Sequence, residues 1–165
     1  MTVTERLGEV LRDADGVRLE FVRTYDVPPT DVWSAVTDPE RMERWIGRWT
    51  GDPATGRVEF VMSAAGSERP ETVLIHDCSA PTHLAMTLES RDGPWPLELT
   101  LTDQGDRTVL RFVHQLAEPY NASTIGPVWQ NFLDRLDSVL VGAPAPDDFG
   151  AYVARFGDAY AIPSA

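Results

Sequence analysis

Apolar and polar positions alternate along much of the first part of this chain, which is the pattern of half-buried strands. Val17, Leu19 and Phe21 alternate with charged neighbours, and the segment EVLRD precedes them across the turn ADG. A glycine-containing turn between two such segments favours a tight connection. We therefore predict a hairpin from Thr4 to Tyr25.

Two short helices are predicted after this hairpin. A proline pair ends the strand, because proline cannot donate to a sheet ladder, and the segment from about residue 30 to 37 follows with its apolar residues on one side. The second helix begins at Asp38, a good N-cap residue, with a proline in its first turn. Met42, Trp45 and Ile46 follow at helical spacing and predict one buried face.

Alternation returns between residues 51 and 118, interrupted by turn residues. Short strands joined by short turns are antiparallel neighbours in a sheet. We expect them in the segments RVEFVM, ETVLIHD, HLAMTLE, PLELTL and RTVLRFVHQL.

The clearest helical pattern runs from Ile125 to Leu140, with apolar residues at positions 125, 128, 129, 132, 133, 136, 139 and 140. Polar residues, among them Gln130 and Asp137, occupy the opposite face. Pro127 fits near the start of the helix, and a glycine follows its end. A shorter helix is expected over residues 149–156.

These elements predict an α+β fold. The sheet has one apolar face and the helix has one apolar stripe, and each is buried most simply against the other. We expect an apolar cavity between them, because ligand sites are mostly apolar with few polar anchors.

Composition narrows the function. The chain has 165 residues, 42% of them hydrophobic, and we expect a single domain over residues 1–165, as a monomer or homodimer. No apolar segment approaches the ~20 residues that span a bilayer, and the charged first residues contain no apolar segment of a signal peptide. A cytoplasmic location is therefore expected.

Charge excludes several partners and mechanisms. The net charge of -12 would repel nucleic acid and anionic membranes, so we expect neither as a partner. All 14 basic residues are arginine. Schiff-base chemistry and a lysine general base are thus impossible. Cys78 is the only cysteine, so the chain can form no intrachain disulfide and no cysteine-rich zinc site.

The segment VRTYDVPPTDVWSAVTDPERMERWIG resembles the opening motif of the SRPBCC superfamily, in the branch named for the activator of the Hsp90 ATPase. VLIHDCSAPTHLAMT is similar to the central hairpin of that family, and GPVWQNFLDRL to its closing helix. The resemblance implies a helix-grip fold: a curved antiparallel sheet wrapped around a long C-terminal helix, with two short helices after the first strand. Members of the family include lipid carriers, polyketide aromatase/cyclases and co-chaperones, so the fold alone does not select a function.

The candidate ligand-binding residues are those whose side chains, by strand alternation or helical period, should point into the space between sheet and helix. Each could instead be ordinary packed core. They are Trp45, Phe60, Met62, Met86, Leu99, Leu101, Phe112, Trp129, Phe132 and Leu136, with His114 and Tyr120 as polar candidates.

The polar candidates could anchor a ligand. His114 shares strand parity with Phe112, so it should lie on the inward face, where it could bind a carbonyl or carboxylate, act as a general base, or simply bond to backbone. Tyr120, in the loop before the long helix, could donate its hydroxyl or pack against the helix. His76 and His83 flank a turn and could face one another, but we expect surface residues and neither a metal site nor a cofactor.

Three functions remain open. The first is binding of a small apolar molecule, aromatic or lipid-like, without catalysis; we assign no catalytic residue. The second is a polyketide aromatase/cyclase-type enzyme that uses His114. The third is a co-chaperone-like interaction module, which should expose an apolar patch on the outer sheet face, where Arg57, Glu59, Glu98, Thr100 and Arg111 are expected instead.

Overall fold

A computed structural model describes residues 7–164 of the chain. The strands are β1 (Glu9–Asp13), β2 (Gly16–Tyr25), β3 (Arg48–Thr50), β4 (Arg57–Val61), β5 (Glu71–Ser79), β6 (His83–Ser90), β7 (Gly93–Asp103) and β8 (Thr108–Leu116). The helices are α1 (Pro29–Thr37), α2 (Pro39–Met42), α3 (Ala122–Val141) and α4 (Phe149–Phe156), with single 3-10 turns at Pro53–Thr55, Ser63–Ala65 and Gly157–Tyr160.

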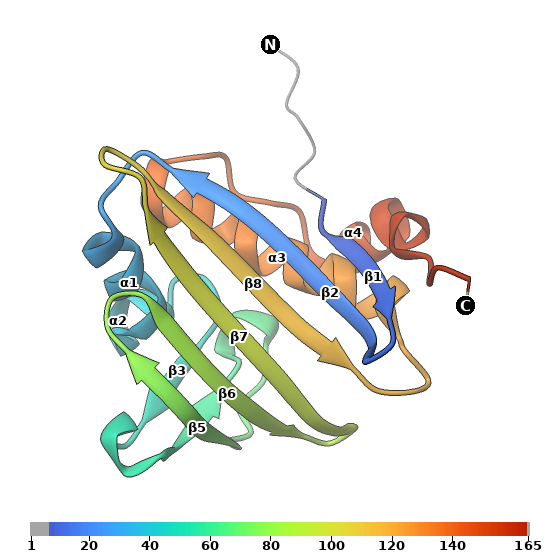
Figure 1. The fold of residues 1–165 in the computed structure, drawn as a ribbon, viewed down its shortest axis with the longest axis horizontal. Coiled ribbons are helices and arrows are strands. Elements are labelled where there is room, and N and C mark those ends of the chain that lie inside the picture. The colour runs from blue at the N-terminus through green and yellow to red at the C-terminus, as the bar shows by residue number, and fades with distance from the viewer. Residues whose placement is uncertain (1–6, 165) are drawn as a thin grey trace.

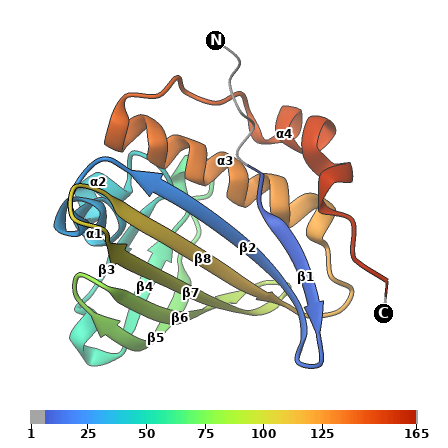
Figure 2. The same cartoon turned by 45° about the horizontal axis from the view of Figure 1, so that its top comes forward.

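The strands of the described residues form one antiparallel sheet of eight strands, in the order β1-β2-β8-β7-β6-β5-β4-β3. The sheet curves, and α3 lies across its concave face, with α1 and α2 near one end (Figures 1 and 2). The predicted α+β helix-grip fold is therefore confirmed.

The hydrophobic core fills the layer between the sheet and α3. Strand residues of one parity, such as Leu19 and Leu110, belong to the same buried hydrophobic cluster as apolar residues of α3, such as Leu136. This is the burial that the alternating and helical patterns predict.

Several predicted elements differ from the structure; β7, for example, begins at Gly93 and not at Pro96, and α3 begins at Ala122 and not at Ile125. The first hairpin is present from Glu9 onward, whereas Thr4 to Arg6 of the predicted range lie outside the described residues. The second short helix is only Pro39–Met42, yet Trp45 and Ile46 are still buried by the turns that follow it. Strand β3 was not predicted, because a strand of three residues is too short to display a period.

The polar face of α3 is largely buried, which the sequence pattern does not predict. Gln130, Asn131 and Asp137 are almost fully enclosed, because β2 and the C-terminal segment cover that side of the helix. Tyr160 donates its hydroxyl to Oε1 of Gln130 at 2.8 Å, and the amide of Asn131 donates to the carbonyl of Asp147 at 2.7 Å. Hydrogen bonding thus compensates the desolvation of these side chains.

An ion-pair network joins α3 to β2. Arg23 Nη1 lies 2.8 Å from Asp137 Oδ2 and 2.8 Å from Asp134 Oδ1. Tyr25 donates its hydroxyl to Asp137 at 2.7 Å, and Tyr152 of α4 donates to Asp134 at 2.7 Å. Carboxylates on this face of α3 therefore bind side chains of β2 and α4 and hold both elements against the helix.

Candidate functional site

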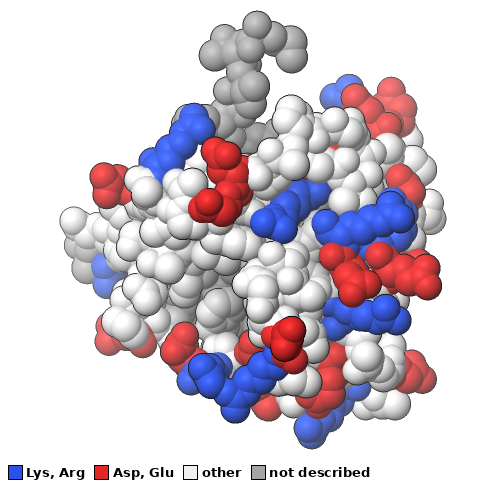
Figure 3. All heavy atoms as spheres, turned by 180° about the vertical axis from the view of Figure 1, so that it is seen from behind, with Lys and Arg blue, Asp and Glu red and all other residues white. Residues whose placement is uncertain are grey.

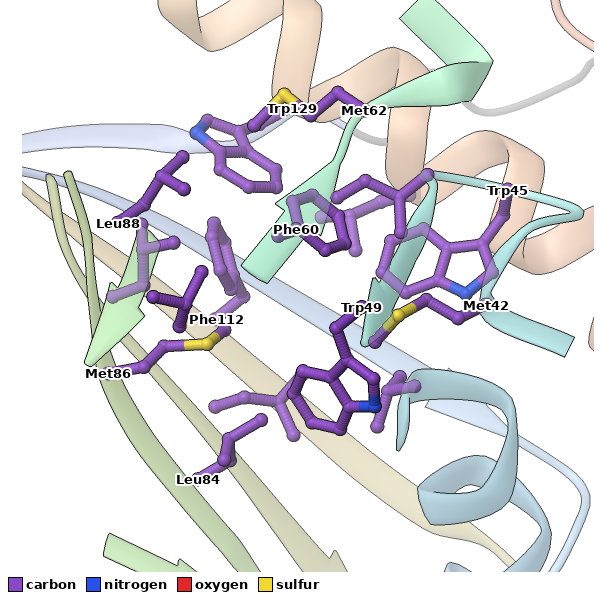
Figure 4. Close-up of a pocket in the computed structure, with 16 residues that line it drawn as sticks. Met42, Trp45, Trp49, Phe60, Met62, Leu84, Met86, Leu88, Phe112 and Trp129 are labelled. Carbon is purple, nitrogen blue, oxygen red and sulfur yellow. The ribbon is translucent and has the colours of Figure 1, made fainter. Parts of the chain in front are cut away.

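A small cavity, here called the inner cavity, lies between the sheet and α3 and has a volume of about 60 Å³. Figure 4 shows Met86 and Leu88 on one side of it and Met42 and Trp45 on the other. Its lining is apolar and consists of Val36, Met42, Trp45, Ile46, Trp49, Phe60, Met62, Val73, Leu84, Met86, Leu88, Leu97, Leu99, Phe112, Trp129 and Leu133.

The volume sets what the inner cavity can hold in this conformation. A cavity of about 150 Å³ lined by apolar side chains stays dry and admits benzene, so about 60 Å³ is too small for an aromatic ring without movement. Met42, Met62 and Met86 belong to the wall. Methionine is unbranched and flexible, so these side chains can change rotamer at low cost and enlarge the space.

A second hollow, the outer pocket, lies between the end of the sheet and the N-terminal half of α3 and has a volume of about 440 Å³. Ligand pockets for small molecules begin at roughly 300 Å³. Its lining residues come from the turn before β7, from β7 and β8, from the loop after β8 and from α3; they are Asp92, Pro94, Trp95, His114, Leu116, Ala117, Glu118, Pro119, Asn121, Thr124, Ile125 and Val128.

Three rings separate the two hollows. Trp129 belongs to the wall of the inner cavity, whereas Trp95 and His114 belong to the wall of the outer pocket. The Trp95 ring packs on the His114 ring with centroids 4.7 Å apart, and Trp129 contacts Phe112 with centroids 4.5 Å apart. We call Trp95, His114 and Trp129 the aromatic partition.

The hydrogen bonding of His114 defines its protonation. Trp129 Nε1 lies 3.0 Å from His114 Nδ1. An indole nitrogen can only donate, so Nδ1 must be the unprotonated acceptor and the neutral ring carries its proton on Nε2. The side chain is 1% exposed, and burial lowers the pKa of His114 from 6.5 to about 4. The imidazole is therefore neutral at pH 7 and has an N–H group to donate.

A family model described as "Activator of Hsp90 ATPase homolog 1-like protein" matches residues 26–141. The match runs from directly after β2 to the last residue of α3, and so includes most of the sheet and the helix that enclose both hollows. The chain belongs to this family.

Solved structures of similar fold cover nearly the whole chain. The crystal structure of CalU16 from Micromonospora echinospora superposes with a TM-score of 0.74 at 26% identity, and the alignment covers 96% of each chain. A conserved protein of unknown function from Enterococcus faecalis, EF2215, gives 0.72 at 18% identity over 92% of this chain and 89% of that one.

A further similar structure is DynU16, a protein in the dynemicin biosynthetic locus. It gives a TM-score of 0.58 at 18% identity, covering 79% of this chain and 50% of DynU16. No match was found among curated proteins. These solved structures support the helix-grip fold of this chain.

The predicted ligand-binding residues fall into three groups in this fold. Those in the wall of the inner cavity are Trp45, Phe60, Met62, Met86, Leu99, Phe112 and Trp129. His114 is in the wall of the outer pocket. The structure does not bring Leu101, Phe132, Leu136 and Tyr120 to the described lining of either hollow.

These four residues have other surroundings. Leu101, Phe132 and Leu136 are packed in the core; Phe132, for example, contacts the ring of Phe149 with centroids 5.0 Å apart. Tyr120 is half-buried in the loop before α3, and the Arg12 guanidinium lies 5.9 Å from its ring centroid. Parity and helical period predict burial, but they do not distinguish a packed side chain from a cavity wall.

Several wall residues were not predicted, although a signal for some of them was present. Leu84 and Leu88 share strand parity with Met86, and Leu97 shares it with Leu99. The same parity argument could therefore have found them. Trp49 could not be found this way, because it lies on the short strand β3.

The remaining histidines lie on the outer face of the sheet and do not face one another. His76 Nε2 is 2.8 Å from the hydroxyl of Thr87, whereas His83 bonds to Asp77 and, at 2.9 Å, to Glu98. The hydrogen bonds that His83 donates to the carboxylates of Asp77 and Glu98 raise its pKa. Within residues 7–164, no group of three or more histidine, cysteine or acidic side chains could hold a metal ion.

Cys78 is exposed, and partial burial together with the Asp77 charge raises the pKa of its thiol. A raised pKa lowers the thiolate fraction, so the residue does not resemble a nucleophile. No helix in the described part of the chain is long and apolar enough to cross a membrane.

Proposed function

We propose that this protein binds a small hydrophobic molecule, aromatic or lipid-like, in the space between its sheet and α3. The observation that carries the proposal is the pair of hollows in this layer, one entirely apolar and the other large enough for a small ligand. An apolar site of this kind needs only a few polar anchors. The occurrence of the same fold in a protein of a biosynthetic locus is consistent with this function.

Catalysis by His114 as a general base has less support. Its Nδ1 already accepts a hydrogen bond from Trp129, and its Nε2 carries the proton, so the ring can donate but has no free acceptor. A co-chaperone-like role also has less support, because charges on the outer sheet face pair with one another. Glu20 accepts from Arg111 at 2.7 Å, and Val22 is the exposed large apolar residue of β2.

A pair of substitutions on α3 tests the proposal. Val128 and Val139 are both half-buried on this helix, but only Val128 belongs to the described lining of the outer pocket. Val128→Trp would fill the pocket with an indole, so naphthalene affinity measured by calorimetry should fall at least about tenfold, a change of about 1.4 kcal/mol. Val139→Trp is the matched control and should leave the affinity unchanged.

Equal affinities in both variants, or no naphthalene binding by the wild-type protein, would contradict the proposal. Native mass spectrometry of protein purified from its own host would complement the titration. A co-purified small molecule that is absent from the Val128→Trp variant is the expected result, and its mass would identify the natural ligand.

A further inference from the structure

The side chain of His114 has one nitrogen that the protein does not use. Nδ1 accepts from Trp129, whereas no partner of Nε2 is found among the described residues. In the same residues no fully enclosed side-chain nitrogen or oxygen lacks a partner. It follows that Nε2 is not fully enclosed, and the hollow that this ring lines is the outer pocket.

Such a group is costly to leave without a partner. His114 is 1% exposed, so little water can reach it, and a buried donor without a hydrogen bond loses roughly 1–3 kcal/mol of solvation. A ligand oxygen placed at Nε2 would recover this loss. The Nε2–H group is therefore suited to bind an acceptor atom of the ligand.

The fixed orientation of the ring strengthens this argument. The Nδ1 bond to Trp129 sets the tautomer, and the Trp95 ring packs against the imidazole with centroids 4.7 Å apart. A hydrogen bond to a donor that is already oriented costs less entropy than one to a mobile side chain.

The walls of the outer pocket select the rest of the ligand. Trp95 supplies an aromatic surface, and Leu116, Ile125 and Val128 supply aliphatic ones. The charged residues in the described lining are the carboxylates Asp92 and Glu118. With a net charge of -12, the protein disfavours an anion at this position.

We infer that the outer pocket binds an uncharged aromatic carbonyl compound, with its carbonyl oxygen accepting from His114 Nε2 and its ring against Trp95. The inference rests on the proposed function, because it assigns a chemical class to the ligand of the same layer. It also gives the aromatic partition a role, since Trp129 holds His114 in the orientation that presents the donor.

Matched probes test this assignment. 2-Acetylnaphthalene is a neutral aromatic ketone, and 2-isopropenylnaphthalene has the same planar outline but has a methylene group in place of the carbonyl oxygen. The measured quantity is the ratio of their dissociation constants, which cancels the general hydrophobic contribution. One net hydrogen bond corresponds to a change of about three- to tenfold in that ratio.

Two variants of His114 make the comparison specific. His114→Leu removes both nitrogens, so the relative preference for the ketone should fall by about three- to tenfold. His114→Gln can accept from Trp129 through Oε1 and donate through its amide nitrogen, so it should keep most of the preference. 2-Naphthoate, the anion of similar shape, should bind the wild-type protein more weakly than the ketone.

A measurement on the wild-type protein covers the case in which His114→Leu fails to fold. In a spectrum of ¹⁵N-histidine-labelled protein, the ketone should shift the His114 Nε2 resonance, the hydrocarbon should shift it less, and exposed His76 should not respond. If both probes bind equally and Nε2 does not respond to the ketone, the inference is overturned and the proposed function stands. If neither probe binds, both are overturned.

Discussion

His114 couples the chemistry of the pocket to the stability of the fold. Its pKa is lowered from 6.5 to about 4 by burial, and protonation would also set an N–H of the ring against the N–H of Trp129. The unfolded chain therefore takes up a proton below about pH 6.5, whereas the folded chain resists protonation until about pH 4. The contribution of His114 to the free energy of unfolding is therefore fully present above about pH 6.5, and it is lost as the pH falls from about 6.5 to about 4.

The expected size of this loss is roughly 3 kcal/mol between neutral pH and pH 4, at about 1.4 kcal/mol per pH unit. Denaturant unfolding at a series of pH values measures it. In His114→Gln the loss over this window should be smaller by a similar amount. An identical pH profile for the variant and the wild-type protein would show that His114 is not held neutral.

His83 provides a control of opposite sign. Asp77 and Glu98 raise the pKa of His83 in the folded chain. Its contribution to the free energy of unfolding is therefore fully present below 6.5, the pKa in the unfolded chain, and it is lost as the pH rises through the higher pKa of the folded chain. His83→Gln should therefore leave the acid loss of stability in place. Only the behaviour above about pH 6.5 should change.

At the scale of elements, the carboxylates of α3 act as a connection to β2. The side chain of Arg23 is 2% exposed, and Asp137 supplies one of the carboxylates beside it. Asp137→Ala would remove that charge, and breaking a buried ion pair from one side costs about 3–5 kcal/mol. Chemical denaturation should show this loss, whereas Asp106→Ala, at a 92% exposed turn residue, should change the free energy of unfolding by less than about 0.5 kcal/mol.

The C-terminal segment packs closely on α3 at Gly126. A methyl group added there would overlap the ring of Tyr160. Gly126→Ala should destabilise the fold by about 1–3 kcal/mol through overpacking, despite the better helix propensity of alanine. Gly150→Ala in α4 is the matched control, because its added Cβ would lie 3.4 Å from Asp148 Oδ1, and it should be neutral or stabilising. Thermal unfolding of both variants checks the prediction; equal midpoints would contradict it.

The same elements show what the sequence could predict. Alternation identified the strands and helical period identified α3, because burial of one face imposes a period on the residues. The burial of Gln130 and Asp137 could not be predicted, because it depends on which distant segments cover the polar side of α3. His114 was assigned inward by parity alone, but its bond to Trp129 depends on how α3 is placed against β8.

At the scale of the whole molecule, charge and apolar surface are separated. Acidic and basic side chains intermingle on the face seen in Figure 3, with uncharged surface between them. The large apolar residues are mostly buried between the sheet and α3; those exposed among the described residues are Leu7, Val22 and Val141. A hydrophobic partner would therefore gain most by entering the interior, which favours a small molecule over a second protein.

The central claim is that this interior layer admits a small hydrophobic molecule. Protein labelled with ¹³C at the methionine methyl groups can test it directly by NMR during titration with naphthalene. Met42, Met62 and Met86 belong to the wall of the inner cavity, the indole N–H of Trp95 reports on the outer pocket, and that of Trp129 reports on the aromatic partition. We predict saturable shifts of the Trp95 and Trp129 signals with one-to-one stoichiometry, and shifts of the methionine signals if the inner cavity enlarges. Unchanged Trp95, Trp129 and methionine signals at saturating naphthalene would contradict the account.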